Sequence, residues 1–341
     1  MRTRPSTNTS AFYLPMTETE LLQAFDESVR EIGNSDGLDL ANRGISSLPE
    51  LPATFADLQQ LSLEKNQLTS LPESIARLTK LETLSLYRNQ LVDLPESLWQ
   101  LKNLRSLNLS ENRLSVLSCN IGKLGNLHTL DLGHNALVSL PGSLGNLSGL
   151  TRFLYIHDNQ LTALPASLGN LRNLAYLNVS SNLLTSLPVN TGDLAGLIEL
   201  RCSENKLTSL PDSIGGLAKL KELHLMNNQL TSLPESIGSL ANLRKMNLRD
   251  NQLAFLPESV GNLARLAELD LRNNALATLP ESLQRLQKLA YLDLRANLLV
   301  SLPDWIEGLG SLEKLDLRWN KLSLFPGRMR RLEERGCTIL L

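Results

Sequence analysis

The sequence is poor in cysteine and in aromatic residues, and its charges nearly cancel. Three cysteines in 341 residues are too few for a disulfide framework and favour a reducing compartment. The 33 Lys and Arg residues against 35 Asp and Glu residues leave a net charge of −2, so we expect no general attraction to nucleic acid or to an anionic membrane. The chain has no run of 18 apolar residues, which argues against a membrane span. These absences predict a cytoplasmic protein with neither a nucleic-acid nor a membrane partner.

The sequence also lacks the local motifs of common enzymes. It contains no Gly-rich phosphate loop, no HExxH pair, no nucleophile elbow and no zinc-ligand spacing. Cys202 and Cys337 fall at an expected core position and an expected terminal strand, whereas a reactive thiol needs an exposed cationic pocket. We therefore predict no catalytic residue, no cofactor and no enzymatic activity.

A repeated segment occupies most of the chain. Its clearest copy is residues 58–78, LQQLSLEKNQLTSLPESIARL. An asparagine returns every 23 residues, with a single step of 24 between Asn135 and Asn159. The asparagines of this series are Asn66, Asn89, Asn112, Asn135, Asn159, Asn182, Asn205, Asn228, Asn251, Asn274, Asn297 and Asn320. A fixed period of this length predicts a solenoid of stacked repeats.

Each repeat predicts a short strand, a turn and a short return segment. Leu61 and Leu63 alternate with polar residues, as in a strand with one buried face. Asn66 ends that strand, and its amide can bond backbone groups of the turn and of the neighbouring repeat. Pro72 fixes the backbone before a return segment of one or two helical turns. One repeat buries too little apolar surface to fold alone, so the repeats must stack into one cooperative body.

We predict three parts along the chain. Residues 1–16 are rich in Ser and Thr and are expected to form a disordered leader, with a targeting signal as the alternative. Residues 17–36 open with a capping box and carry apolar residues on one face, which predicts a helical N-terminal cap. Residues 37–341 form an array of about 13 repeats that ends in a terminal strand at 337–341.

The pattern Leu-x-x-Leu-x-Leu-x-x-Asn-x-Leu resembles the signature of leucine-rich repeat proteins. The 23-residue spacing with Leu-Pro-x-Ser-Ile-Gly-x-Leu is similar to that of intracellular Ras-group leucine-rich repeat proteins, their plant relatives and bacterial proteins that include type III effectors. The resemblance implies an α/β fold, a right-handed curved solenoid with parallel strands along its concave face. It also implies that a partner commonly binds this face.

We therefore predict that the protein is a monomeric, non-enzymatic scaffold that binds a protein partner on the concave face. The alternative is the recognition part of a bacterial effector or ubiquitin-ligase system that acts on a host protein. Such an effector would be delivered into the host cell by a specialised secretion system.

Aromatic and histidine side chains gather at the predicted concave positions of the middle repeats, although a repeat needs no exposed aromatic residue to fold. Such residues commonly anchor protein interfaces. The partner-binding residues that we predict are Tyr87, His134, Phe153, Tyr155, His157, Tyr176, Arg201, His224 and Met226. Residues 151–159 carry the one extra residue, which suggests a bulge in the strand and leaves Phe153 either exposed or in the core.

His134 and His157 fall on adjacent strands, but two imidazoles without a carboxylate or thiolate constellation are weak evidence for a metal, so we predict no metal site. A second feature is a charged patch in which four arginines run beside a column formed by Asn247, Asp270, Asp293 and Asp316. Its members are Arg249, Arg272, Arg295 and Arg318. Either the two columns neutralise each other, or the guanidinium groups receive an acidic or phosphorylated partner.

Overall fold

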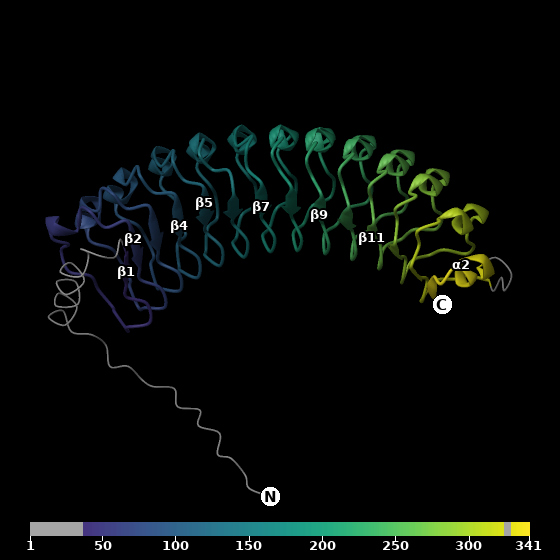
Figure 1. The fold of residues 1–341 in the computed structure, drawn as a ribbon, viewed down its shortest axis with the longest axis horizontal. Helices are drawn as coiled ribbons and strands as arrows, with labels where there is room; N and C mark the ends of the chain where they lie inside the picture. The colour runs from purple at the N-terminus through teal and green to yellow at the C-terminus, as the bar shows by residue number, and fades with distance from the viewer. Residues whose placement is uncertain (1–36, 324–328) are drawn as a thin grey trace, which may run out of the picture.

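The chain passes once through each repeat and builds a parallel sheet that follows an arc. The computed structural model describes residues 37–323 and 329–341, and the repeats lie side by side in chain order (Figure 1). In these ranges the strands are β1 Gly37–Asp39, β2 Gln60–Ser62, β3 Thr83–Ser85, β4 Ser106–Asn108, β5 Thr129–Asp131, β6 Phe153–Tyr155, β7 Tyr176–Asn178, β8 Glu199–Arg201, β9 Glu222–His224, β10 Lys245–Asn247, β11 Glu268–Asp270, β12 Tyr291–Asp293, β13 Lys314–Asp316 and β14 Thr338–Leu340. The predicted solenoid with parallel strands is confirmed.

Neighbouring strands keep a constant register, so residues one period apart lie next to each other. Leu61 of β2 pairs with Leu84 of β3, which pairs with Leu107 of β4. These middle residues point into the core and are buried, as the alternation of apolar and polar residues predicts. The residues that flank these leucines within each strand, together with the two residues just before each asparagine (Glu64 and Lys65 after β2), form what we call the open face of the sheet, its solvent-facing side.

The return segments form 3₁₀ helices along the outer side of the arc (Figure 1). Within the described ranges they are η1 Ala53–Phe55, η2 Glu73–Arg77, η3 Glu96–Gln100, η4 Cys119–Lys123, η5 Gly142–Asn146, η6 Ala166–Asn170, η7 Thr191–Asp193, η8 Asp212–Gly216, η9 Glu235–Ser239, η10 Glu258–Asn262, η11 Glu281–Arg285 and η12 Asp304–Gly308. Pro72 precedes η2 with φ −71, close to the value that the proline ring imposes. Ser118 replaces this proline before η4, and its hydroxyl accepts a hydrogen bond from the Asn120 N–H instead. The predicted short return segment is confirmed.

The asparagine of each repeat joins that repeat to the one before it. The Asn182 carboxamide oxygen accepts a hydrogen bond of 3.0 Å from the Leu161 N–H. Its Nδ2 donates to the carbonyls of Ile156 and Val179, at 3.0 and 3.1 Å. These backbone groups are buried and cannot bond to water, so the asparagine carboxamide supplies the hydrogen-bond partners that they would otherwise lack. The bonding role predicted for this asparagine is confirmed.

The last repeat is covered by a short helix and by β14. Helix α2 spans Arg330–Glu334 and buries Leu332. Arg331 lies 3.7 Å from the Glu307 carboxylate, and the Arg335 guanidinium donates to the Glu307 backbone carbonyl. Strand β14, placed at 337–341 by the sequence, pairs with β13. The predicted N-terminal cap and leader lie outside the described residues.

The extra residue of the sixth strand lies before the strand, so the predicted bulge is wrong. Phe153 pairs with Thr129 and Leu154 with Leu130, in the same register as the other strands. The ring Nδ1 of His128 lies 3.0 Å from the Gly149 carbonyl and 3.3 Å from the Thr151 hydroxyl, which places it against the lengthened turn. With the extra residue in the turn, β6 keeps its regular backbone hydrogen bonds to the neighbouring strands. A bulge inside the strand would leave a backbone group unpaired.

Candidate functional site

Three aromatic rings form a cluster on the open face at β6 and β7. The rings of Phe153 and Tyr155 stack with their centroids 5.8 Å apart. The Tyr176 ring lies 5.7 Å from the Phe153 ring and 5.1 Å from the Tyr155 ring. Phe153 is 41% exposed, because Leu154 takes the core position of β6. We call these three residues the aromatic patch; of the two alternatives for Phe153, the exposed one is confirmed.

Two histidines extend the aromatic patch towards the turns that follow β5 and β6. The His157 ring contacts both the Tyr155 ring, at 6.0 Å, and the His134 ring, at 4.8 Å. Burial lowers the pKa of His157, while the nearby Asp131 carboxylate opposes this effect. Burial also raises the pKa of Asp131, with the Gly133 N–H acting in the opposite direction. The rings thus border a partly buried carboxylate on the open face.

On the other side of the aromatic patch, charged residues pair with one another. The Arg201 Nε lies 2.5 Å from Glu199 Oε1. The His224 ring Nε2 lies 3.1 Å from Glu222 Oε2, and burial lowers the pKa of His224, while Glu222 opposes this effect. His224 is only 8% exposed, so its neighbours cover most of the surface that we expected it to offer to a partner.

Tyr87 and Met226 lie apart from the aromatic patch. The Tyr87 hydroxyl donates a hydrogen bond of 2.8 Å to Glu111, three strands before β6. The Met226 sulfur accepts a hydrogen bond from the Asn247 side chain, beside the charged patch. The structure therefore brings together five of the nine predicted partner-binding residues through ring contacts, namely His134, Phe153, Tyr155, His157 and Tyr176.

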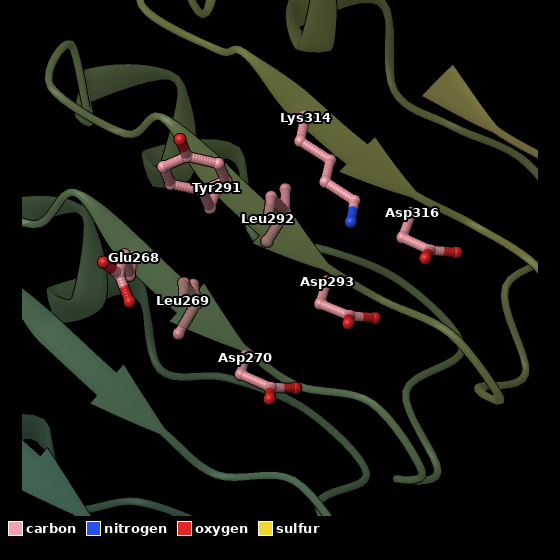
Figure 2. Close-up of a pocket in the computed structure, with 8 residues that line it drawn as sticks. All are labelled: Glu268, Leu269, Asp270, Tyr291, Leu292, Asp293, Lys314 and Asp316. Atoms are coloured by element: carbon pink, nitrogen blue, oxygen red, sulfur yellow. The ribbon is translucent and has the colours of Figure 1, made fainter. Parts of the chain in front are cut away.

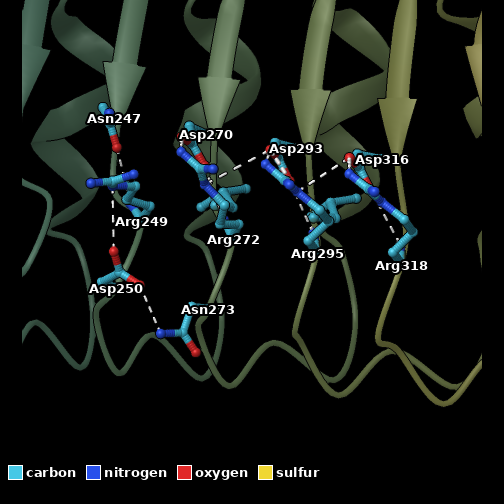
Figure 3. A network of polar contacts seen from close by, with 12 residues as sticks. Asn247, Arg249, Asp250, Asp270, Arg272, Asn273, Asp293, Arg295, Asp316 and Arg318 are labelled. Atoms are coloured by element: carbon cyan, nitrogen blue, oxygen red, sulfur yellow. Dashed lines mark hydrogen bonds and ion pairs between the residues drawn. The ribbon is translucent and has the colours of Figure 1, made fainter. Parts of the chain in front are cut away.

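Three arginines of the charged patch, Arg272, Arg295 and Arg318, each pair with the aspartate of their own repeat, whereas Arg249 pairs with Asp250 (Figure 3). Arg295 lies 2.6 Å from Asp293 and 3.2 Å from Asp316, so it bridges two repeats. Arg318 adds a contact of 2.7 Å to Asp316, whose side chain is only 1% exposed. These pairs favour the alternative in which the two columns neutralise each other; an acidic partner for the guanidinium groups stays a prediction.

Two hollows at the C-terminal end of the open face were not predicted. One of about 310 Å³ is lined by Glu268, Leu269, Asp270, Tyr291, Leu292, Asp293, Lys314 and Asp316 (Figure 2). The other, of about 350 Å³, includes Trp319, which is 73% exposed. The Arg318 guanidinium lies 5.7 Å from the centre of the Trp319 ring. The signal for Trp319 was its position just before Asn320, a column that also holds His134 and Asp158.

The buried cysteines are unsuited to act as nucleophiles. Cys202 is fully buried in the core and burial raises the pKa of its thiol far above the ordinary range. Burial also raises the pKa of Cys337, although the Arg335 charge lowers it in part. A thiol with a raised pKa holds little thiolate near neutral pH, and the thiolate is the reactive form.

Models of repeat families match separate segments of the chain. A leucine-rich repeat region model matches residues 231–332. Two further leucine-rich repeat models match residues 56–114 and 172–230, and residues 126–147. No curated protein sequence matches the chain. Within the described ranges, none of the helices has the length and apolar character needed to cross a membrane.

Solved structures give the same family. A leucine-rich repeat protein of Leptospira interrogans is 34% identical, with a TM-score of 0.85, and the match covers 96% of this chain and 82% of that one. The plant peptide hormone receptor RGFR1 in complex with RGF2 is 32% identical, with a TM-score of 0.75, over 87% of this chain and 50% of the receptor. TLR13 in complex with ssRNA13 is 26% identical, with a TM-score of 0.73, over 89% of this chain and 45% of TLR13. The chain belongs to the leucine-rich repeat family.

Proposed function

We propose that the protein is a non-enzymatic scaffold that binds a protein or peptide partner on the concave face of its solenoid. The observation that carries the proposal is the aromatic patch of Phe153, Tyr155 and Tyr176. Three rings in mutual contact stand on the open face, although the strands are already held by the leucines beneath them. Extended curved surfaces of this kind are what solenoid proteins use for binding.

The chemistry of the aromatic patch suits the centre of an interface. Phe153 is 41% exposed, and covering an aromatic ring releases water from a large apolar area with little loss of side-chain freedom. Burial raises the pKa of Tyr155 and of Tyr176, so both phenols stay neutral near neutral pH and can donate a hydrogen bond. The Arg201–Glu199 pair beside them would form part of a polar rim.

The similar structures support a peptide or protein ligand more than a nucleic acid. RGFR1 is a peptide hormone receptor in complex with RGF2, and PEPR1, 27% identical, is in complex with AtPEP1. TLR13 binds ssRNA13, so RNA binding occurs among chains of similar fold. A net charge of −2 and arginines paired with carboxylates speak against RNA here.

We also propose that the protein is cytoplasmic and monomeric and that its repeats are of the type found in Ras-group and plant intracellular leucine-rich repeat proteins. The alternative function, recognition of a host protein by a bacterial effector or ubiquitin-ligase system, draws some support from the bacterial relative. Both functions use the same surface, so one binding experiment tests the site for either.

The test removes the aromatic patch and measures binding to one identified partner. The chain is used as bait in an extract of its source cells, and the captured protein is then purified. We expect the variant Phe153→Thr/Tyr155→Thr/Tyr176→Thr to raise the dissociation constant for that protein at least about tenfold, because the three rings would form the buried centre of the interface. Threonine keeps a good strand-forming residue at each position.

A matched control removes apolar surface elsewhere. Val116 and Val138 are 71% and 51% exposed and lie past the asparagines of their repeats, in the segments that lead to η4 and η5 and not on the open face, so Val116→Thr/Val138→Thr should keep the affinity of the unmodified chain. Circular dichroism and thermal unfolding verify that each variant is folded. Equal dissociation constants for the unmodified chain and the aromatic variant would refute the proposed site.

A further inference from the structure

We propose that His134, His157 and Asp158 form a binding site for a divalent transition-metal ion, with Zn²⁺ as the best-suited ion. The site does not depend on the function proposed above. The sequence suggested only the two imidazoles; the structure adds the carboxylate of Asp158, whose Oδ2 lies 3.5 Å from His134 Nε2 and 3.9 Å from His157 Nε2. Two imidazoles and one carboxylate are a known ligand set for zinc and other divalent transition metals.

The distances suit a small ion. Zinc binds nitrogen and oxygen ligands at about 2.0–2.2 Å, so ligand atoms in a tetrahedral site lie about 3.3–3.5 Å apart. The potential ligand atoms of the three residues all lie within 4.8 Å of one another. The His134 side chain is 52% exposed, so a small rotation brings its ring nitrogen closer. Three protein ligands leave a fourth position for water.

The backbone brings the three side chains together. His134 and Asp158 occupy the same left-handed turn position in successive repeats, with φ of 50 and 52, and the His134 N–H donates to the His157 carbonyl at 2.9 Å. Gly133 makes room for the ring of His157: a β-carbon there would lie 2.4 Å from its Cε1 atom. Any other residue at 133 would push this ring aside.

The electrostatics favour a cation. In the described part of the chain the ion-pair contacts of these three residues are with one another, and no Arg or Lys joins them. Asp131 adds negative charge, since its carboxylate acts on both imidazoles. The Nδ1 of His157 is buried, so its Nε2, which lies 3.9 Å from Asp158 Oδ2, is the ring nitrogen that an ion could reach.

A second group of histidine and carboxylate side chains differs from the proposed site because an arginine pairs with one of its carboxylates. Glu199, Glu222 and His224 also lie within 4.8 Å of one another. However, the Arg201 guanidinium lies 2.5 Å from the Glu199 carboxylate. That cation already neutralises the ligand and would repel a metal ion. This second group therefore serves as an internal control for the first.

The test is a titration of the full-length chain, free of any affinity tag and stripped with a chelator, with ZnSO₄ in a calorimeter. We expect one Zn²⁺ per chain, and we expect His134→Ala and Asp158→Asn each to weaken binding at least about tenfold. His134→Ala removes a largely exposed side chain and should leave the fold intact, which circular dichroism verifies. The matched control, His224→Gln, should bind Zn²⁺ as the unmodified chain does.

Three outcomes would overturn the proposal. The unmodified chain could bind no Zn²⁺ in the titration. His224→Gln could lose binding while His134→Ala retains it, which would assign the ion to the second group. Several ions could bind with equal affinity to the unmodified chain and to His134→Ala, which would be adventitious binding only. A single site lost in both His134→Ala and Asp158→Asn supports the proposed ligands.

Discussion

At the scale of single residues, Asp316 is the acidic group on which the charged patch depends. Its side chain is 1% exposed and contacts Arg318 at 2.7 Å and Arg295 at 3.2 Å. Burial by itself raises the pKa of Asp316, but the hydrogen bonds from Arg318 and the charges of both arginines outweigh it, and the pKa is lowered. The carboxylate therefore stabilises the folded chain in its ionised form.

We predict that Asp316→Asn lowers the free energy of unfolding near pH 7 by about 1–3 kcal/mol, because two arginines lose a charged acceptor. A lowered folded-state pKa means that this stabilisation is present above the unfolded-state value of about 3.9 and is lost as the pH falls through the folded-state value. The difference between the variant and the unmodified chain should therefore shrink below about pH 4. Urea unfolding at several pH values measures it.

Asp250 provides the control for this prediction. Its side chain is 34% exposed and lies 3.3 Å from Arg249, so Asp250→Asn should cost no more than about 1 kcal/mol. An equal loss in the two variants would contradict the special role of Asp316.

At the scale of elements, close contact between neighbouring 3₁₀ helices explains the glycine of the Leu-Pro-x-Ser-Ile-Gly-x-Leu pattern. Gly238 lies in η9, and a β-carbon added there would lie 2.3 Å from the Ser259 carbonyl oxygen of η10. The corresponding distance at Gly192 is 1.8 Å, to Ser213. Glycine at these positions lets successive repeats approach each other on the outer side of the arc.

We therefore predict that Gly238→Ala lowers the free energy of unfolding by about 1–3 kcal/mol through overpacking against a backbone oxygen. Gly308 of η12 is the matched control, since a β-carbon there meets nothing within 4 Å. Gly308→Ala should be neutral or stabilise by up to about 1 kcal/mol. Thermal and urea unfolding compare the two variants, and similar effects of both would rule out the packing explanation.

At the scale of the whole molecule, each strand of residues 37–323 and 329–341 pairs only with its sequence neighbours within those ranges, in the order β1 to β14. A middle repeat is thus buttressed from two sides, and the first and last described strands from one side. Such arrays lose structure most easily at their ends, because opening an end breaks one interface and opening the middle breaks two.

Hydrogen exchange measured by mass spectrometry should therefore show the slowest amide exchange around β6 to β9 and faster exchange near β1 and β14. The central strands have the same length as the terminal ones, so the gradient would come from position in the array and not from strand length. Uniform exchange along the array would mean that it opens only as a whole.

The fold could be predicted from the sequence because the residue pattern of one repeat specifies the structure of that repeat, and the same pattern recurs along the array. The leucine positions, the strands near Leu61 and its equivalents, and the bonding of Asn182 all follow from a side chain's place within one period. The position of the extra residue near Thr151 could not be predicted in this way, because the sequence allows it either in the strand or in the turn before it. The pairing of β6 with β5 shows that it lies in the turn.

What the sequence determined by itself is the buried half of the molecule, because each period fixes which side chains its neighbours cover. The tertiary structure decided which side chains contact one another on the open face, because these contacts join residues of different repeats. Stacking covered His224, paired Arg295 with two aspartates, and placed Asp158 beside two imidazoles. Such contacts depend on the distances between side chains of neighbouring repeats and on their rotamers, and the sequence of one repeat specifies neither.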